Sequence, residues 1–212
     1  MPSSLNRMTR RSNFLWNKAC SLWFELLLGV DTRGAVEAPT HESVHYTPLP
    51  YPMIFRMLKL LDLKESDVFV DIGCGKGRVV CCASRLPLRK VVALELNGKL
   101  LTKALDNAMT MRGRRAPIDP VNKSAEEYDY ADATVVYLYN PFNARITDLV
   151  MEKVFLSHSR CPRPIRVVYA NPVHEMALRK HSWLEKYEEW PASDFPAFAR
   201  SVSFWRSLHT NL

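Results

Sequence analysis

The chain has 212 residues, of which 47% are hydrophobic and 24% are charged, and its formal net charge is +7 at pH 7. This length and composition predict one domain with a sizeable core, preceded by an N-terminal extension. The positive charge permits an acidic partner such as RNA, anionic lipid or an acidic protein. The basic residues are scattered, however, and do not alternate with aromatic residues as they do in RNA-binding patterns.

The N-terminal extension contains one apolar segment. Residues 1–11 are polar and basic and are expected to be frayed, whereas residues 14–30 are mostly apolar. Polar and charged residues interrupt this segment and no small-x-small cleavage site follows it, so it predicts neither a signal peptide nor a membrane span. We interpret it as an amphipathic helix that stops at Gly29. Its aromatic residues are expected to pack on the domain, to pair with a second subunit or to contact a membrane surface, in that order of preference. They are Trp16, Trp23 and Phe24.

The linker that follows carries an H-E-x-x-H pattern, from His41 to His45. Such a pattern binds zinc when a helix places both histidines on one face. Here Pro39 and Pro48 leave room for at most two helical turns, and no third ligand is evident nearby. No metal site is therefore predicted.

Beyond residue 50, segments with the apolar spacing of helices alternate with short apolar runs typical of buried strands. The expected helices are residues 52–63, 78–86, 97–112 and 143–159. Asn97 is expected to cap the third of these helices, and Val154 and Phe155 are expected among the inner residues of the fourth. The expected strands are residues 68–71, 91–95, 118–122, 133–139 and 165–170, followed by an antiparallel hairpin of residues 183–190 and 200–206. This order predicts an α/β fold with a doubly wound, mostly parallel, seven-stranded sheet.

A glycine-rich turn follows the first predicted strand. It has the spacing G-x-G-x-G from Gly73 to Gly77, and no Gly-Lys-Ser/Thr follows, so it is not a P-loop. Glycines let backbone N–H groups approach a ligand closely, and the next helix directs its positive end at that ligand. Glu95 ends the second strand about 20 residues later, where doubly wound nucleotide-binding folds place an acid that accepts ribose hydroxyls.

Three motifs resemble those of the class I S-adenosylmethionine-dependent methyltransferases. Residues 70–77, Val-Asp-Ile-Gly-Cys-Gly-Lys-Gly, resemble the first motif of this family, and residues 92–95, Val-Ala-Leu-Glu, resemble the second. Asn140-Pro141-Phe142, after the fourth predicted strand, resembles the fourth-strand motif of the amine-methylating members. The resemblance implies two regions. Residues 1–45 would form a tail, a helix and a linker or lid, and residues 46–212 would form a Rossmann-like methyltransferase domain.

The resemblance also implies that S-adenosyl-L-methionine is the cofactor. Asp71 would orient its amino group, directly or through water, and Glu95 would hold its ribose. In the family, an N-terminal segment with a tyrosine and a small hydroxyl residue crosses the cofactor, and Tyr46-Thr47 resembles that segment. A turn after the third strand would hold the adenine, although Lys123 replaces the usual acid there. The implied cofactor-binding residues are Tyr46, Thr47, Asp71, Gly73, Gly75, Gly77, Glu95, Leu96, Ser124, Ala125 and Asn140.

The fourth-strand motif implies transfer of the methyl group to nitrogen, with Asn140, Pro141 and Phe142 as the catalytic residues. The Asn140 side-chain oxygen and a backbone carbonyl of the turn would accept N–H bonds from a substrate amine. Pro141 would stiffen the turn, and Phe142 would stack on a planar or cationic group. The family motif has two prolines where this chain has one. Transfer to oxygen stays open for that reason, and it would require a general base.

The sequence therefore predicts a cytoplasmic methyltransferase that acts on a small-molecule amine or a protein side chain. The five cysteines form no C-x-x-C pair and no disulfide-like spacing, which indicates free thiols in a reducing compartment. The alternatives left open are an O-methyltransferase or an RNA methyltransferase of the same fold, and a cofactor-binding protein without catalysis. Nucleic acid is not favoured, because no appended recognition domain is apparent.

Overall fold

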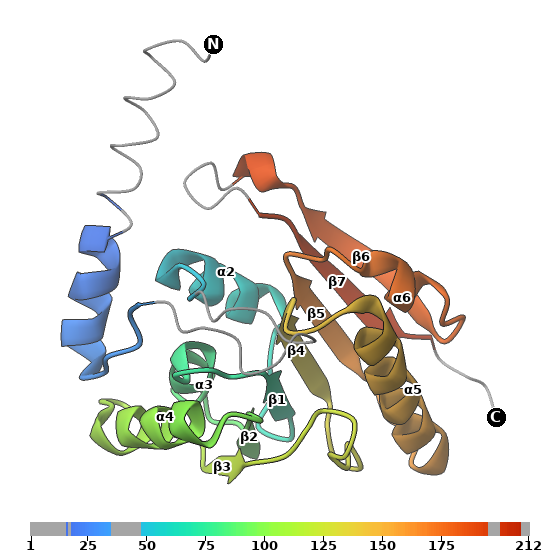
Figure 1. Ribbon diagram of the computed structural model, residues 1–212, viewed down its shortest axis with the longest axis horizontal. Coiled ribbons are helices and arrows are strands. Elements are labelled where there is room, and N and C mark those ends of the chain that lie inside the picture. The colour runs from blue at the N-terminus through green and yellow to red at the C-terminus, as the bar shows by residue number, and fades with distance from the viewer. Residues whose placement is uncertain (1–15, 17, 35–47, 195–199, 209–212) are drawn as a thin grey trace, which may run out of the picture.

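Seven strands form one sheet in the order β3-β2-β1-β4-β5-β7-β6 (Figure 1). The computed structural model describes residues 16, 18–34, 48–194 and 200–208. The first five strands are parallel to one another and β7 is antiparallel to both β5 and β6, as the sequence predicted. The strands are β1 (Val68–Ile72), β2 (Lys90–Leu94), β3 (Ile118–Val121), β4 (Val135–Tyr139), β5 (Arg166–Ala170), β6 (Leu184–Trp190) and β7 (Val202–Ser207).

Helices cover both faces of the sheet (Figure 1). A helix of residues 18–28, called here the N-terminal helix, precedes the others. The others are α2 (Tyr51–Leu60), α3 (Arg78–Ala83), α4 (Gly98–Thr110), α5 (Ala144–Arg160) and α6 (Glu175–Arg179), with a 3-10 turn, η1, at Ala192–Asp194. Every residue of β1 is buried, which a parallel strand covered on both faces requires.

Successive residues of each strand point to opposite faces, so the core divides into two clusters. Phe69 of β1 belongs to the cluster under α2, α3 and α4, whereas its neighbours Val68 and Val70 belong to the cluster under α5. The glycine-rich turn leaves the end of β1 between these layers. Its ligands would therefore lie at the carboxyl edge of the sheet.

Two helix boundaries depend on asparagine caps. The Asn97 side chain accepts the N–H groups of Lys99 and Leu100, at 3.0 and 3.3 Å, which confirms the predicted cap of α4. Asn143 caps α5 in the same way through the N–H group of Ile146. These caps fix where each helix leaves the edge of the sheet.

The sequence interpretation of the helices was wrong in two places. Phe155 was expected on the inner face of α5 but is 38% exposed, because the buried face is centred on Val150, Met151 and Val154, and the position after Val154 lies at its margin. The short helix α6 was not predicted at all, because five residues are too few to show a helical period.

The N-terminal helix packs against the body of the protein with one face only. The Phe24 ring stacks on Tyr51 at 5.1 Å between centroids and lies 5.2 Å from Phe55, and Leu28 is fully buried. Packing on the domain is thus the observed arrangement for Phe24. Trp16 and Trp23 do not pack on the domain in this way, since their side chains are 72% and 59% exposed.

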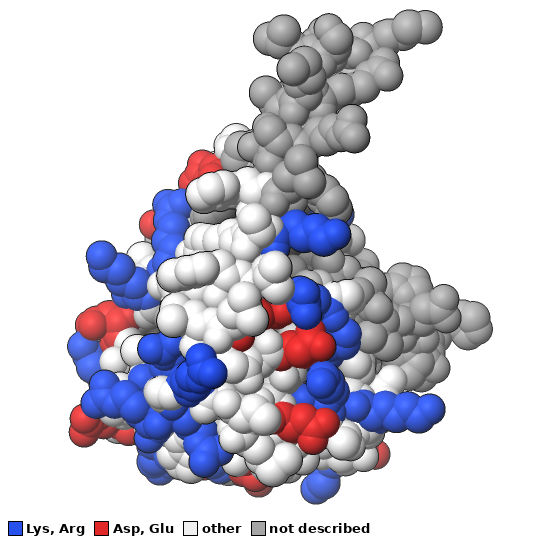
Figure 2. All heavy atoms as spheres, turned by 90° about the vertical axis from the view of Figure 1, so that its left-hand side faces the viewer, with Lys and Arg blue, Asp and Glu red and all other residues white. Residues whose placement is uncertain are grey.

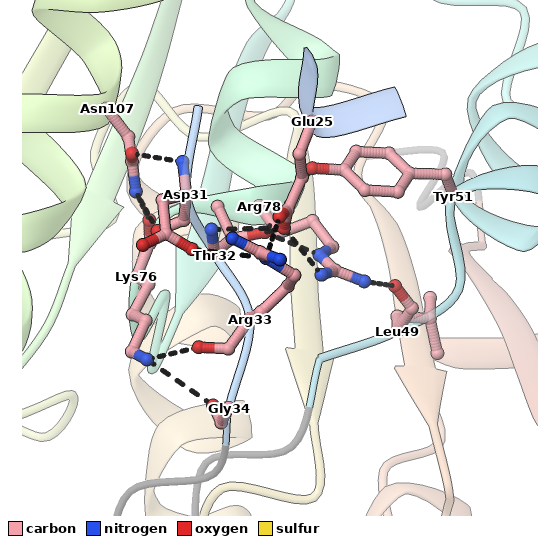
Figure 3. A network of polar contacts seen from close by, with 10 residues as sticks. All are labelled: Glu25, Asp31, Thr32, Arg33, Gly34, Leu49, Tyr51, Lys76, Arg78 and Asn107. Atoms are coloured by element: carbon pink, nitrogen blue, oxygen red, sulfur yellow. Dashed lines mark hydrogen bonds and ion pairs between the residues drawn. The ribbon is translucent and has the colours of Figure 1, made fainter. Parts of the chain in front are cut away.

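A buried acid fixes this helix to α3 (Figure 3). Glu25 Oε1 accepts the Thr32 hydroxyl at 2.7 Å and lies 3.0 Å from Arg78 Nη2, and all three residues are buried. Arg78 also donates to the Thr32 hydroxyl at 2.7 Å and to the Leu49 carbonyl at 3.0 Å. The second carboxylate oxygen of Glu25 forms an ion pair with Arg33, whose Nε lies 2.6 Å away.

The same network reaches the glycine-rich turn. Lys76, inside the turn, donates to the carbonyl oxygens of Arg33 and Gly34. The Asn107 amide of α4 bonds to the backbone N–H and carbonyl of Asp31, at 2.8 and 3.0 Å, and donates to the Lys76 carbonyl at 2.9 Å. Residues 25–34 are therefore attached to the turn and to α4 by directed bonds (Figure 3).

Replacing Arg78 with leucine is expected to lower the free energy of unfolding by about 3 kcal/mol or more, because Glu25 would keep a buried, poorly paired carboxylate. The matched change Arg33→Leu should cost less than Arg78→Leu, because Arg33 is half-exposed and the contacts of Glu25 Oε1 with Arg78 and Thr32 remain. Urea unfolding of both variants measures the difference. Equal and small losses would contradict a structural role for the buried pair.

Candidate functional site

The predicted site residues that the structure describes lie at the carboxyl edge of the sheet, after the ends of β1, β2, β3 and β4. Chain order reverses between β1 and β4, because β2 and β3 lie to one side of β1 and later strands lie to the other. In open α/β sheets, ligands bind in the crevice at such a switch point. The topology thus brings together motifs that are far apart in the sequence.

The glycine-rich turn packs closely against two neighbours. Gly73 and Gly77 have φ angles of +70° and +78°, which favour glycine. A Cβ atom on Gly73 would lie 3.0 Å from the Pro141 side chain, and one on Gly77 would lie 3.0 Å from the Ala104 side chain of α4. The first contact brings the turn after β1 against the Asn-Pro turn after β4. The second allows α3 to begin directly beside α4.

Glu95 joins the end of β2 to this turn. Its Oε2 accepts the N–H group of Gly75 at 2.9 Å, and its Oε1 accepts the N–H group of Asn97 at 2.9 Å. Each carboxylate oxygen keeps further lone pairs for a ligand hydroxyl. The carboxylate is therefore held in a fixed position beside the turn, as its predicted role requires.

Asn122, just after β3, holds the backbone that carries Glu95. Its amide nitrogen donates to the carbonyl oxygens of Glu95 and Leu96, at 2.8 and 2.9 Å. The sequence interpretation did not include Asn122, because its partners lie on a neighbouring strand and no local pattern connects them. Beside it, the Leu96 side chain is 52% exposed and presents apolar surface at the edge of the sheet.

Two buried carboxylates lie close together here. Asp71, near the end of β1, is 2% exposed. Burial, together with the negative charge of Glu95, raises the pKa of Asp71 well above its ordinary value, and a hydrogen bond from the backbone of Val80 partly opposes this. The negative charge of Glu95 makes this edge of the sheet favourable for a cationic ligand.

The raised pKa of Asp71 predicts a pH dependence of stability. Between the ordinary pKa of aspartate, about 4, and the raised value, the native state binds more protons than the unfolded state. The free energy of unfolding therefore falls as pH rises through this window. Asp71→Asn should remove this fall and raise the melting temperature at pH 7. Thermal unfolding at pH 5 and pH 8 measures the effect, with Asp62→Asn as a control at an exposed carboxylate. An equal shift at both pH values would contradict it.

The turn after β3 has the two residues predicted to hold the adenine. Ser124 is half-buried and Ala125 is buried, and the Ala125 carbonyl accepts the hydroxyl of Tyr130 at 2.9 Å. The other predicted cofactor residues, Tyr46 and Thr47, lie outside the residues that the structure describes, as does the H-E-x-x-H pattern.

Asn140 follows β4 with a left-handed backbone, at a φ angle of +39°, and its side chain is largely buried. Asparagine tolerates this conformation better than most residues. Its Oδ1 accepts the hydroxyl of Tyr169 of β5 at 2.9 Å. Phe142, two residues on, is half-buried and packs against the cluster under α5.

Tyr169 fixes the orientation of that amide. It is fully buried, and its hydroxyl accepts the backbone N–H group of His174 at 3.3 Å, so its own proton is directed to Asn140. Burial raises the pKa of Tyr169, which keeps the hydroxyl protonated and able to donate. The sequence interpretation missed this residue, because it lies 29 positions from Asn140 on a neighbouring strand.

A second Asn-Pro turn lies beside the first. Asn171, after β5, has a φ angle of +50°, and its N–H group donates to the Ser201 carbonyl at 2.8 Å. Tyr139 of β4 pairs with Ala170 of β5, so the two turns leave adjacent strands at the same level. Asn171 is thus the counterpart of Asn140 on the next strand, and a substitution there is a suitable control for one at Asn140.

Comparison with known proteins begins with the sequence. No family model matches the chain. A protein-lysine N-methyltransferase from Saccharolobus islandicus (strain REY15A) is 31% identical over 97 residues, which are 45% of this chain. The matched part spans 60% of that relative's length.

Solved structures share the fold over most of the chain. An RNA methyltransferase from Salinibacter ruber, solved with S-adenosyl-L-homocysteine, superposes with a TM-score of 0.61 at 25% identity, over 78% of this chain and 97% of that one. An O-methyltransferase from Thermotoga maritima gives a TM-score of 0.61 at 16% identity, over 79% of this chain and 69% of that one. These comparisons confirm the predicted fold class and the resemblance to the class I S-adenosylmethionine-dependent methyltransferases.

Proposed function

We propose that this chain, which has the fold of the class I S-adenosylmethionine-dependent methyltransferases and is similar to them in sequence, methylates a nitrogen atom of a protein lysine side chain. The observation that carries the proposal is the convergence of three strand ends. Glu95 bonds to the glycine-rich turn, and that turn packs against the Asn140-Pro141 turn. A nucleoside site and an acceptor site are thereby adjacent.

The residues present fit S-adenosylmethionine. Glu95 is held by two backbone N–H groups and keeps lone pairs for ribose hydroxyls. The exposed backbone of Gly73 leaves room for the amino-acid portion, and the exposed Leu96 offers an apolar contact for the adenine. The positive charge of the ligand would favour the ionised form of the buried Asp71, and that carboxylate would then balance the charge, because opposite charges attract strongly where water is excluded.

Asn140 would position the acceptor. Its side-chain oxygen already accepts the Tyr169 hydroxyl, which fixes the amide and leaves a second lone pair on that oxygen. This lone pair and a backbone carbonyl of the turn would accept two N–H groups of a neutral amine and so orient the nitrogen lone pair. Tyr169 is a positioning residue in this scheme, because it acts through Asn140.

When bound, S-adenosylmethionine supplies a methyl group on a cationic sulfur: the nitrogen–carbon bond forms as the carbon–sulfur bond breaks, S-adenosylhomocysteine leaves, and the nitrogen releases a proton to water. The contribution of the chain is to hold and orient the two reactants and to limit access of water to them. Lysine is preferred as the acceptor because the curated relative is a protein-lysine N-methyltransferase.

RNA is the second candidate acceptor, because the solved structure with 25% identity is an RNA methyltransferase. The scattered basic residues of this chain do not favour it. RNA binding would also weaken steeply with salt, since Lys and Arg contacts to phosphates release counterions.

The test is incubation of the pure protein with methyl-labelled S-adenosylmethionine and fractionated cell extract. We expect label in the protein fraction, sensitive to protease, with methyl-lysine in the hydrolysate. Label that is sensitive to ribonuclease would replace the lysine proposal with an RNA one. Calorimetric binding of S-adenosylhomocysteine without label in any fraction would indicate a cofactor-binding protein without catalysis.

A further inference from the structure

The outer face of the N-terminal helix is apolar and exposed. Five large apolar side chains are between 42% and 72% exposed there. Singly exposed apolar residues are ordinary, but a contiguous group on one helix face marks an interaction surface. We name this group the outer apolar face. It consists of Trp16, Leu22, Trp23, Leu26 and Leu27.

The helix cannot turn this face inward. Its inner face is already occupied by Phe24, which stacks on α2, by the buried Leu28 and by Glu25. Glu25 bonds to Thr32 and Arg78 inside the protein, and reversing the helix would expose that network (Figure 3). The only acid of residues 18–28 is therefore buried, whereas several large apolar side chains of the helix stay exposed on its other face.

Positive charge accompanies the outer apolar face. The first 24 residues of the chain contain four basic residues, Arg7, Arg10, Arg11 and Lys18, and no acid. A groove of about 380 Å³ separates Leu22 and Leu26 from α4, which contributes Lys103, and Arg112 follows that helix. Asp31 and Asp106 also line this groove, beside Arg33 and the two basic residues of the α4 side. Figure 2 shows the uncharged surface on this side of the molecule with Lys and Arg side chains, and some Asp and Glu side chains, around it.

We infer that the outer apolar face docks on an anionic lipid surface, with the helix lying in the plane of the headgroups. Apolar and aromatic side chains between basic residues are the features of interfacial helices, and tryptophan prefers the depth of the headgroups. Within the described residues, no helix is long and apolar enough to cross a membrane. The geometry therefore fits a helix that lies on the bilayer rather than one that spans it.

Charge favours this occupant over a second copy of the chain. A symmetric dimer through the outer apolar face would bring Lys18, Lys103 and Arg112 of one copy near those of the other, and like charges at an interface are destabilising. An anionic bilayer instead attracts these residues, and each Lys or Arg near the surface raises the affinity for the bilayer about fivefold. The inference does not depend on the proposed methyl transfer.

The test is sedimentation of the full chain with vesicles of phosphatidylcholine and phosphatidylglycerol at a ratio of about 3:1, against phosphatidylcholine alone. We expect binding to the anionic vesicles that weakens in 0.5 M salt. The double variant Trp23→Glu/Leu26→Glu should bind at least about tenfold more weakly, and Lys18→Gln about fivefold more weakly. Leu156→Glu, at an exposed apolar residue of α5, is the matched control and should bind as the wild type does.

A measurement on the wild type alone excludes misfolding as the cause. Trp183, Trp190 and Trp205 are buried, whereas Trp16 and Trp23 are exposed, so quenching by brominated lipid reports on the N-terminal helix. We expect quenching with anionic vesicles and unchanged melting temperatures in the variants. Equal binding to neutral and anionic vesicles, or no quenching, would overturn the inference. A stable dimer in light scattering that the double variant dissociates would assign the face to a second copy.

Discussion

Glu95→Ala is expected to weaken binding of S-adenosylhomocysteine at least about 100-fold. Hydrogen bonds between a carboxylate and hydroxyl groups contribute about 1.5–3 kcal/mol each, and the ribose would lose two of them. The Gly75 and Asn97 N–H groups would also lose their acceptor, which loosens the glycine-rich turn. Titration calorimetry at pH 7 measures the change in affinity.

Two further variants refine this prediction. Glu95→Gln keeps one oxygen acceptor but places an NH₂ group against a backbone N–H donor, so it should bind with intermediate affinity. Asn122→Ala removes the bonds to the Glu95 and Leu96 carbonyls without touching the carboxylate, and should weaken binding by less than Glu95→Ala. Wild-type affinity in Glu95→Ala would contradict the assignment of the nucleoside site.

Asn140→Ala is expected to lower kcat about 100-fold while the affinity for S-adenosylhomocysteine changes less than about threefold. The reason is that the side chain would orient the acceptor nitrogen, and loss of one such contact typically costs 10²–10³ in rate. Alanine at a positive φ angle adds strain of about 1 kcal/mol, so stability will fall as well. Single-turnover rates and calorimetry separate the two effects.

Asn171→Ala is the matched control, because Asn171 also precedes a proline at a strand end and has a positive φ angle. It should lose as much stability as Asn140→Ala but keep most of the rate. Equal losses of rate in the two variants would contradict a specific role for Asn140.

The role of Tyr169 in this unit is open to the same assay. Tyr169→Phe removes only the hydroxyl that donates to Asn140, so kcat should fall about tenfold. When Tyr169→Phe is added to the Asn140→Ala variant, kcat should not fall further, because the two residues would act as one unit. Tyr137→Phe, at a buried tyrosine in the core cluster on the opposite face of the sheet, is the control. Additive losses for Tyr169 and Asn140 would indicate a purely structural contribution of the tyrosine.

Much of the fold followed from short-range pattern. The apolar run before Gly73 predicted a strand covered on both faces, and every residue of β1 is buried. Asn97 predicted the start of α4, since a side-chain acceptor immediately before the first turn is a local requirement for free N–H groups two and three residues later. The two errors also have local causes. The helix α6 is shorter than the window in which a helical period is visible. Phe155 was wrongly predicted to be buried because it is apolar and lies next to the buried Val154 at the margin of the inner face of α5.

The sequence by itself determined the order of strands and helices, the glycine-rich turn and the acid at the end of β2, because each depends on residues near one another in the chain. Only the tertiary structure decided which side chains meet across strands. It brought Pro141 against Gly73, Tyr169 against Asn140 and Asn122 under Glu95. It also decided that the N-terminal helix buries its acid and exposes its tryptophans, because Arg78, 53 residues away, provides the partner that makes burial of Glu25 favourable.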